Sequence, residues 1–340
     1  MTPFDLLQKH PRAHLQSGPT PVEHLMRLSR HLGVEVFVKR DDLTGLGMGG
    51  NKIRQLEFYL GDALAKGADT LLITGAVQSN YARAAAAAAA KLGLDAVVQL
   101  EERVPGMGRT YYQSGNVLLD DLLGARRLNF PEGENEAGAD QALREEADRL
   151  RQQGRRPYVI PLGLDNPPLG ALGYVLAARE VVEQGVAFDC AVVGSGSGYT
   201  HAGFLCGLRA LGIRVPVHGA CVRRSADLQR GRIATISRKL EALLGCPPLG
   251  NDDVLTWDMA LAPGYGRLGP EAREAIALMA RCEGLFVDPV YTAKSLAVLI
   301  ALARDGTIAK GSRVLFIHTG GLPAIFAYEP ELRTDSDRTC

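Results

Sequence analysis

A lysine that follows a glycine-rich turn is the first feature of this chain that could do chemistry. Lys52 comes directly after Gly45-Leu46-Gly47-Met48-Gly49-Gly50-Asn51 and opens an expected amphipathic helix. A lysine is nucleophilic when partial desolvation keeps its amine neutral, and a turn without side chains lets a flat ligand approach it. Neither Ser nor Thr follows Lys52, so the segment is not a P-loop. From its position alone, Lys52 would more often be a surface lysine on a first helical turn. The chain has few other lysines, so Lys52 is the candidate for a reactive one.

A second glycine-rich segment lies between an expected strand and an expected helix, and it reads Gly194-Ser195-Gly196-Ser197-Gly198-Tyr199-Thr200-His201. The dinucleotide fingerprint GxGxxG fails because its third glycine would fall on Tyr199 or His201. The nucleophile elbow GxSxG fails because Ser195 stands two residues before Ser197. Successive backbone N–H groups at a helix start can bind an anion. The segment therefore predicts a phosphate site, with a flexible glycine loop as the alternative.

Three further groups of polar residues occur at expected strand ends or in loops. They are Gln78-Ser79-Asn80, His318-Thr319-Gly320-Gly321, and the loop tyrosines Tyr265 and Tyr291. In open α/β sheets, ligands bind in the crevice outside the carboxyl ends of the strands. The first two segments can therefore face a ligand crevice. Taken alone, 318–321 more often forms a simple turn after a strand, and a loop tyrosine more often packs than reacts.

Charge and composition argue against several classes of protein. The chain has 38 Lys+Arg and 38 Asp+Glu, so it lacks the basic surplus of a nucleic-acid or polybasic membrane binder. It shows no apolar run of transmembrane length and no signal pattern at its start, and its histidines lack the spacing of a metal site. The six cysteines are far apart and indicate reduced thiols in a cytoplasmic protein; they are Cys190, Cys206, Cys221, Cys246, Cys282 and Cys340.

The elements that must position these residues alternate along the chain. Apolar runs of strand length occur at 34–39, 70–75, 95–100, 157–163, 189–194, 215–222 and 313–321. Helical patterns occur at 84–92, 115–124, 172–185 and 271–284, as well as after Lys52 and Thr200. This alternation predicts an α/β fold with a parallel sheet covered on both faces. The length of 340 residues favours two lobes.

In this order, the motifs resemble those of the fold type II pyridoxal-phosphate enzymes. More narrowly, they are similar to the family of D-cysteine desulfhydrase and 1-aminocyclopropane-1-carboxylate deaminase, in segments 39–58, 75–83, 194–203, 288–295 and 318–321. The resemblance implies bound pyridoxal 5'-phosphate and a two-lobed, three-layer αβα fold with parallel-rich sheets, like the tryptophan synthase β subunit. The large cofactor lobe would comprise 1–57 and 165–340, and the small lobe 58–164. Such proteins are typically homodimers that act on small amino acids.

The resemblance also implies a role for individual residues. Lys52 would bond to the cofactor and move the proton at the substrate Cα atom. The cofactor phosphate would lie on Ser197, Gly198, Tyr199 and Thr200, its ring hydroxyl on Asn80 and its ring nitrogen on Thr319. The substrate would contact Gln78, Ser79, Asn80 and Tyr81, with the carboxylate at Ser79. Tyr265 and Tyr291 would line the substrate face as candidate proton donors.

Three positions bear on the choice of reaction. Thr292 and Thr319 stand where the deaminase branch typically carries an acidic and an apolar residue, and a neutral hydroxyl suits loss of a good β leaving group. This favours β-elimination from D-cysteine to pyruvate, ammonia and sulfide. Tyr81 stands where this branch commonly carries histidine, so the leaving group stays open. The alternatives are 1-aminocyclopropane-1-carboxylate deamination, an L-cysteate sulfo-lyase, or a non-catalytic protein that binds pyridoxal phosphate or a nucleotide.

Overall fold

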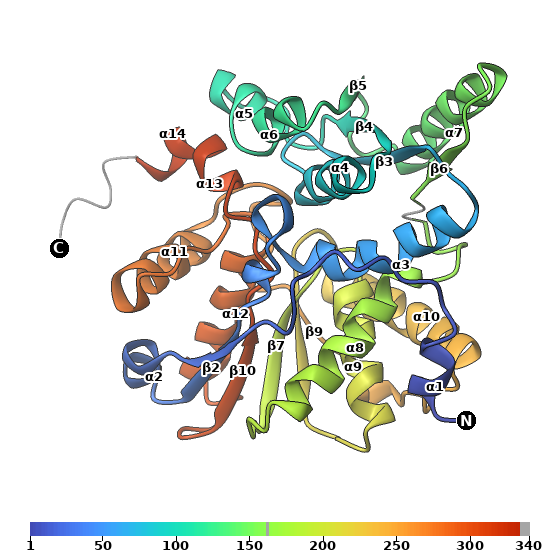
Figure 1. Ribbon diagram of the computed structural model, residues 1–340. Coiled ribbons are helices and arrows are strands. Elements are labelled where there is room, and N and C mark those ends of the chain that lie inside the picture. Colours follow the sequence, from blue (N-terminus) through green and yellow to red (C-terminus); the bar gives the residue numbers. More distant parts are fainter. Residues whose placement is uncertain (161–162, 334–340) are drawn as a thin grey trace.

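The computed structural model describes residues 1–160 and 163–333, which form two sheets flanked by helices (Figure 1). The larger sheet has the strand order β1 (Val22–His24), β2 (Glu35–Lys39), β10 (Arg313–Ile317), β7 (Cys190–Ser195), β8 (Val217–Cys221) and β9 (Leu255–Trp257). Neighbouring strands in this sheet run parallel, apart from the pair β1 and β2, which run antiparallel to each other. The smaller sheet is parallel, in the order β5 (Arg126–Phe130), β4 (Asp95–Glu101), β3 (Thr70–Ala76) and β6 (Pro157–Val159).

The central strands of the larger sheet are apolar on both faces. Ala191 and Val193 of β7 share a core with α8 (Leu169–Glu183), α9 (Tyr199–Ala210) and α10 (Ala226–Leu244). Val192 shares a core with α2 (Met26–Leu32), α11 (Pro270–Glu283) and α12 (Thr292–Arg304). Because successive side chains of a strand point to opposite faces, helices must cover both sides. The predicted three-layer arrangement is therefore confirmed for this sheet.

The smaller sheet is layered in the same way. Leu71 and Ile73 of β3 share a core with α3 (Asn51–Ala65) and α4 (Asn80–Leu92), whereas Leu72 packs with α7 (Glu136–Gln152). The alanines at 84–89 in α4 are at most 2% exposed. Their small side chains let this helix lie close to the sheet. The start of α4 is thereby fixed next to the end of β3.

The remaining elements are short. They are α1 (Pro3–Leu7), α5 (Arg109–Gln113), α6 (Asn116–Leu122), α13 (Ala324–Ala327), α14 (Glu329–Leu332) and the 3₁₀ turns η1 (Asp41–Leu43), η2 (Leu46–Met48) and η3 (Asn251–Asp253). Within 1–160 and 163–333, no helix combines the length and the apolar character needed to cross a bilayer. Cys190, Cys206, Cys221, Cys246 and Cys282 are free thiols, and Cys340 lies outside the described residues.

Most predicted elements are present, with shifted ends. The strand expected at 313–321 stops at Ile317, because Gly320 and Gly321 have φ values of 84° and 97° and turn the chain. The strand expected at 157–163 stops at Val159, and residues 161–162 lie outside the described part. All strands of the smaller sheet fall within the small lobe expected at 58–164. The boundaries of the two lobes stay a prediction. Residues 334–340 of the expected large lobe lie outside the described residues.

Candidate active site

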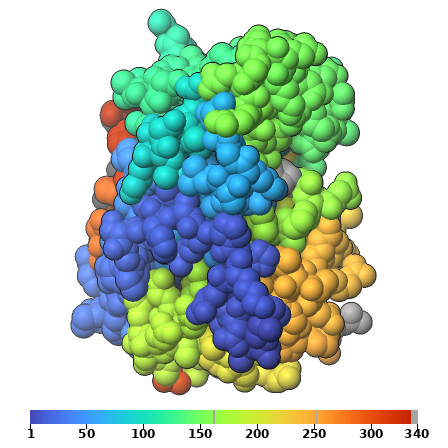
Figure 2. Space-filling view, turned by 45° about the vertical axis from the view of Figure 1, so that its right-hand side comes forward, coloured from blue at the N-terminus to red at the C-terminus, as the bar shows by residue number. Residues whose placement is uncertain are grey.

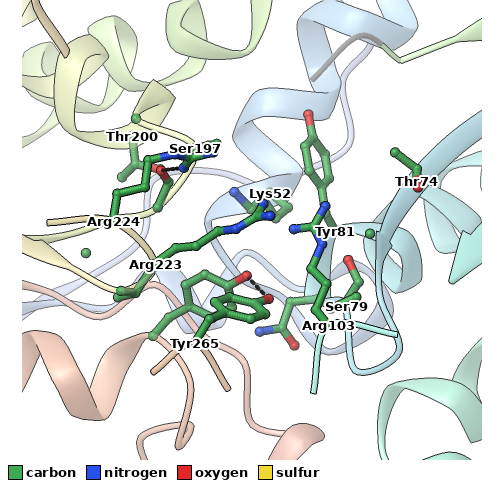
Figure 3. A pocket seen from close by; sticks show the side chains of 18 of the residues that line it. Lys52, Thr74, Ser79, Tyr81, Arg103, Ser197, Thr200, Arg223, Arg224 and Tyr265 are labelled. Carbon is green, nitrogen blue, oxygen red and sulfur yellow. Dashed lines mark hydrogen bonds between the residues drawn. The ribbon is translucent and has the colours of Figure 1, made fainter. Parts of the chain in front are cut away.

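One cavity collects most of the residues singled out from the sequence (Figure 3). It lies where the end of β3, the start of α3, the β7–α9 loop and the end of β10 meet. The predicted site residues that line it are Lys52, Ser79, Asn80, Tyr81, Ser197, Gly198, Thr200, Tyr265, Tyr291 and Thr319. Strand ends and helix starts therefore converge as in other α/β ligand sites.

The backbone around Lys52 is held by glycines. Gly49 has a φ of 65°, and a Cβ atom there would lie 2.0 Å from the carbonyl oxygen of Asp42. The N–H of Gly50 donates to Asp41 O (3.1 Å), and the N–H of Asn51 donates to Thr319 O (3.0 Å). The turn therefore connects η1 to the end of β10, and it places Lys52 on the first turn of α3.

The environment of the Lys52 amine is poor in polar partners. Nζ donates to Gln55 Oε1 at 3.4 Å and lies 4.8 Å from the centre of the Tyr81 ring. Desolvation by burial lowers its pKa to about 8. The pKa of Lys294 is also about 8 because of burial, but its Nζ donates to the carbonyl oxygens of Leu261 and Gly264. Lys52, unlike Lys294, lines the cavity.

We expect the reactivity of Lys52 toward an acylating reagent to follow this pKa. The amine is protonated below its pKa and neutral above it, so the modification rate should rise with pH through a midpoint near 8 rather than 10.5. Competitive labelling of the cofactor-free protein, read by mass spectrometry with the exposed Lys66 as an internal reference, measures the midpoint. A midpoint above about 10 would contradict the desolvated environment.

The start of α4 supplies the residues expected to meet a substrate. Ser79 caps the helix by accepting the N–H of Ala82 (3.1 Å), and Asn80 Oδ1 accepts from Asn116 Nδ2 (2.8 Å). Tyr81 is 6% exposed, and its ring contacts Lys52. The start of α4 and its helix dipole favour a carboxylate at this position.

Gln78 takes a different position from the one expected. Its side-chain amide donates to the carbonyl oxygens of Tyr111 (2.5 Å) and Ser114 (2.9 Å), and it accepts the N–H of Asn116 (2.9 Å). It is 3% exposed and is not part of the cavity lining. Its side chain therefore braces the segment that leads into α6, and a direct contact with substrate is not supported by this geometry.

The β7–α9 loop has the form expected of an anion site. Gly198 has a φ of 95° and precedes the first residue of α9, so the helix start faces the cavity. Thr200 Oγ1 accepts from Asn51 Nδ2 and from Gln55 Nε2, both at 2.9 Å. Tyr199 is 1% exposed and lies in the core rather than in the lining, so it could meet a phosphate only through its backbone.

Two hydroxyl pairs complete the cavity. The hydroxyls of Tyr265 and Tyr291 are 2.7 Å apart, and their rings are edge-on (Figure 3). Burial, with the neighbouring Tyr265, raises the pKa of Tyr291 well above 10.0. Thr319 Oγ1 lies 3.1 Å from Thr292 Oγ1, which donates to the carbonyl oxygen of Gly320 (2.8 Å). The end of β10 thus presents an uncharged hydroxyl to the cavity.

Charged residues that sequence reasoning missed also line the cavity. They are Arg103, Arg223, Arg224, Arg232, Glu101, Glu136 and Asp140. Arg103 follows β4 and Arg223 follows β8, so both come directly after strand ends, the position at which α/β proteins bind ligands. That position was the signal that could have found them.

Comparison with known proteins places this site in a family. The family model described as "Pyridoxal-phosphate dependent enzyme" matches residues 14–320. A protein named D-cysteine desulfhydrase from Yersinia pestis (strain Pestoides F) is 45% identical, over 98% of this chain and 100% of that protein. One of the same name from Klebsiella pneumoniae (strain 342) is 44% identical, over 96% of this chain and 98% of that protein.

Solved structures agree with this assignment. A structure titled as an ACC deaminase homologue superposes with a TM-score of 0.88 at 39% identity, over 97% of this chain and 98% of that one. O-ureido-L-serine synthase, at 19% identity and a TM-score of 0.68, shares the fold over 98% of this chain and 97% of that one. The chain belongs to the family of pyridoxal-phosphate dependent enzymes, and the expected fold type II architecture is confirmed.

Proposed function

We propose that this pyridoxal-phosphate dependent enzyme is a lyase that eliminates the β substituent of D-cysteine or a related β-substituted alanine. The products from D-cysteine are pyruvate, ammonia and sulfide. The observation that carries the proposal is the Lys52 amine, which has a pKa of about 8 and faces the cavity opposite a glycine-lined helix start. The names of the relatives at 44–45% identity support the substrate.

The residues present fit the cofactor. Gly196 and Gly198 line the cavity beside the start of α9, where backbone N–H groups can meet a phosphate. A Cβ atom on Gly198 would lie 2.7 Å from Ile236 Cδ1, so the loop can take this close-packed path only with glycine there. Lys52 would hold the aldehyde carbon, Asn80 the ring hydroxyl and Thr319 the ring nitrogen. When bound, the cofactor supplies a conjugated ring that accepts the electron pair released at the substrate Cα atom.

The chain's own residues divide the remaining work. Lys52 Nζ takes the proton from Cα, because its lowered pKa keeps part of the amine neutral near pH 7. Ser79 and the start of α4 orient the substrate carboxylate, since the Ser79 hydroxyl can still donate while its oxygen caps the helix. Tyr291 keeps its proton because of its raised pKa, and the Tyr265–Tyr291 pair can protonate the departing group.

The threonine pair supports elimination over ring opening. The hydroxyl of Thr292 donates its hydrogen to Gly320 O. Thr292 Oγ1 can therefore only accept a hydrogen bond from Thr319 Oγ1, which lies 3.1 Å away. Neither residue carries a charge that would hold a proton on the cofactor nitrogen as a carboxylate would. A milder electron sink suffices for a good β leaving group, whereas opening a cyclopropane demands more.

A substrate panel tests the proposal. We expect pyruvate from D-cysteine and from D-β-chloroalanine, and no 2-oxobutyrate from 1-aminocyclopropane-1-carboxylate. Release of 2-oxobutyrate at a comparable rate would favour the deaminase. Cofactor binding with no keto acid from any β-substituted alanine of either configuration would favour a non-catalytic binding protein.

The Tyr265→Phe variant should show whether Tyr265 protonates the leaving group or only packs against the cavity. We expect kcat for D-cysteine to fall about 100-fold, the lower end of general-acid effects, because sulfide leaves more easily when protonated. D-β-chloroalanine should keep its rate within about 3-fold, because chloride needs no proton. Tyr112→Phe, outside the cavity lining, is the control. Equal losses for both substrates would assign Tyr265 to packing.

Assembly and location complete the proposal. The enzyme would be a cytoplasmic homodimer, as the family resemblance implies. Leu118 and Leu122 are exposed and lie four residues apart on α6, so they share one face of that helix and support a self-association surface. Sedimentation at micromolar concentration tests the dimer, and a monomer would contradict it.

A further inference from the structure

Two arginines that follow strands of different sheets lie close to the tyrosine pair Tyr265 and Tyr291. Arg103 comes from the loop after β4 and Arg223 from the loop after β8, and their side chains are only 12% and 13% exposed. Figure 3 shows both extending into the cavity near Lys52. The guanidinium carbon of Arg223 lies 5.9 Å from the centre of the Tyr265 ring. Nothing in the elimination of a neutral thiol requires two cations at this position.

The carboxylates at the cavity do not cancel its positive charge. Four arginines line it, against three carboxylates, so 4 − 3 leaves a surplus of one even when Lys52, which the cofactor would engage, is not counted. Arg103 is paired with Glu101 (2.7 Å), which is fully buried. Arg223 is paired with Glu136, whose side chain is 48% exposed and can turn toward solvent. The cavity therefore suits ligands that bring negative charge.

The other sites of negative charge are already matched. Beside the loop expected to hold the phosphate, Arg224 Nη1 donates to Gly196 O (3.3 Å) and Arg232 Nε donates to Ser197 O (2.7 Å), so both guanidinium groups lie where they would face that phosphate. Arg224 also pairs with Glu136 (2.9 Å) and shares it with Arg223. The substrate carboxylate is matched by Ser79 and the start of α4. Arg103 and Arg223 are left for the third part of the substrate, its β substituent, which must lie beside Tyr265 in the proposed reaction.

We propose that the β substituent of the preferred substrate is a tetrahedral oxyanion, a sulfonate or a phosphate ester, bound between Arg103 and Arg223. This rests on the proposed β-elimination. Guanidinium forks match such oxygens in geometry and charge, and the low exposure of both arginine side chains strengthens these bonds. Arg103 and Arg223 are thus specificity-determining residues of this site.

The chemistry balances without a further reactant. With cysteate, Lys52 takes the Cα proton, the Cβ–S bond breaks, and its electron pair leaves with sulfur as sulfite. The remaining aminoacrylate adds water and yields pyruvate and ammonium. With O-phosphoserine, the Cβ–O bond breaks in the same way and phosphate leaves. Both routes are eliminations followed by hydrolysis, so neither needs an external oxidant or reductant.

The test compares three β leaving groups in the holoenzyme and in Arg223→Gln. Both enantiomers of cysteate, O-phosphoserine and β-chloroalanine are assayed for pyruvate, with sulfite and phosphate measured separately. For the oxyanion substrate, Arg223→Gln should lower kcat/KM by about 10- to 100-fold, as expected for a lost charged hydrogen bond. For β-chloroalanine the change should stay below about 3-fold. Arg230→Gln, an exposed arginine outside the cavity, is the control.

The outcomes separate this inference from the proposed function. Sulfite release identifies a sulfonate substrate, and phosphate release identifies a phosphate ester. Turnover of β-chloroalanine and D-cysteine without turnover of either oxyanion would overturn the inference and keep the lyase. Equal effects of Arg223→Gln on all substrates would also overturn it. No keto acid from any substrate would instead refute the β-elimination itself.

Discussion

Lys52→Ala is expected to lower kcat for β-elimination at least about 1000-fold, because it removes both the covalent attachment of the cofactor and the base at Cα. Alanine is the best helix former, so the first turn of α3 should persist. The measurement is pyruvate release from D-cysteine by protein saturated with pyridoxal phosphate, with the folded state checked by circular dichroism.

The matched control is Lys66→Ala, at the other end of α3. Lys66 is 65% exposed and pairs with Asp62 on the surface, so its removal should leave the rate unchanged within about 2-fold. A Lys52→Ala protein that turns over at the wild-type rate would remove Lys52 from the reaction, whatever the role of the rest of the cavity.

Arg54→Met should cost about 3–5 kcal/mol of folding free energy, because it leaves buried carboxylates without their cation. Arg54 is 1% exposed and donates to Asp41 Oδ1 (2.9 Å) and to both carboxylate oxygens of Glu180 (2.8 Å each). Burial alone would raise the pKa of Asp41, but the charges of Arg54 and Lys39 outweigh it and hold that pKa below 3.8. Urea unfolding at pH 7 measures the loss.

The pH dependence follows from the direction of the Asp41 shift. A carboxyl with a lowered folded pKa stabilises the protein above its unfolded pKa, and this stability is lost as the pH falls below about 3.8. The variant should therefore differ most from wild type near neutral pH. Arg151→Met, on the exposed face of α7, should change stability by less than about 0.5 kcal/mol. A loss below about 1 kcal/mol in Arg54→Met would contradict the network.

This network also bears on catalysis. The backbone of Asp41 accepts the N–H of Gly50, two residues before Lys52. Arg54 lies on α3, and α3 also carries Lys52. The buried ion cluster thus fixes the helix and the glycine turn against each other.

Much of the fold could be predicted because buried parallel strands appear as apolar runs, as in β3 and β7. Elements without that signal were missed. Strand β5 has the sequence RRLNF and lies at the sheet edge, where polar residues are tolerated. Strand β1 has only three residues, too few for a periodic pattern. Helices α7, α10 and α12 were also not anticipated.

The site was predictable where local sequence dictates geometry. The glycines before Lys52 and in the β7–α9 loop need φ values that other residues rarely adopt, so their motifs stand out. Side-chain direction is not local, and Gln78 was expected at the substrate but braces 111–116 instead. Arg103 and Arg223 come from different sheets, so only the tertiary fold brings them together.

Reduction of the holoenzyme with borohydride, followed by peptide mapping, tests the central claim most directly. The structure predicts a pyridoxyl-phosphate label on Lys52, because this half-buried amine lines the cavity while Lys39 and Lys294 are held by hydrogen bonds elsewhere. A label on Lys39 or Lys294, or no label on any lysine, would contradict it.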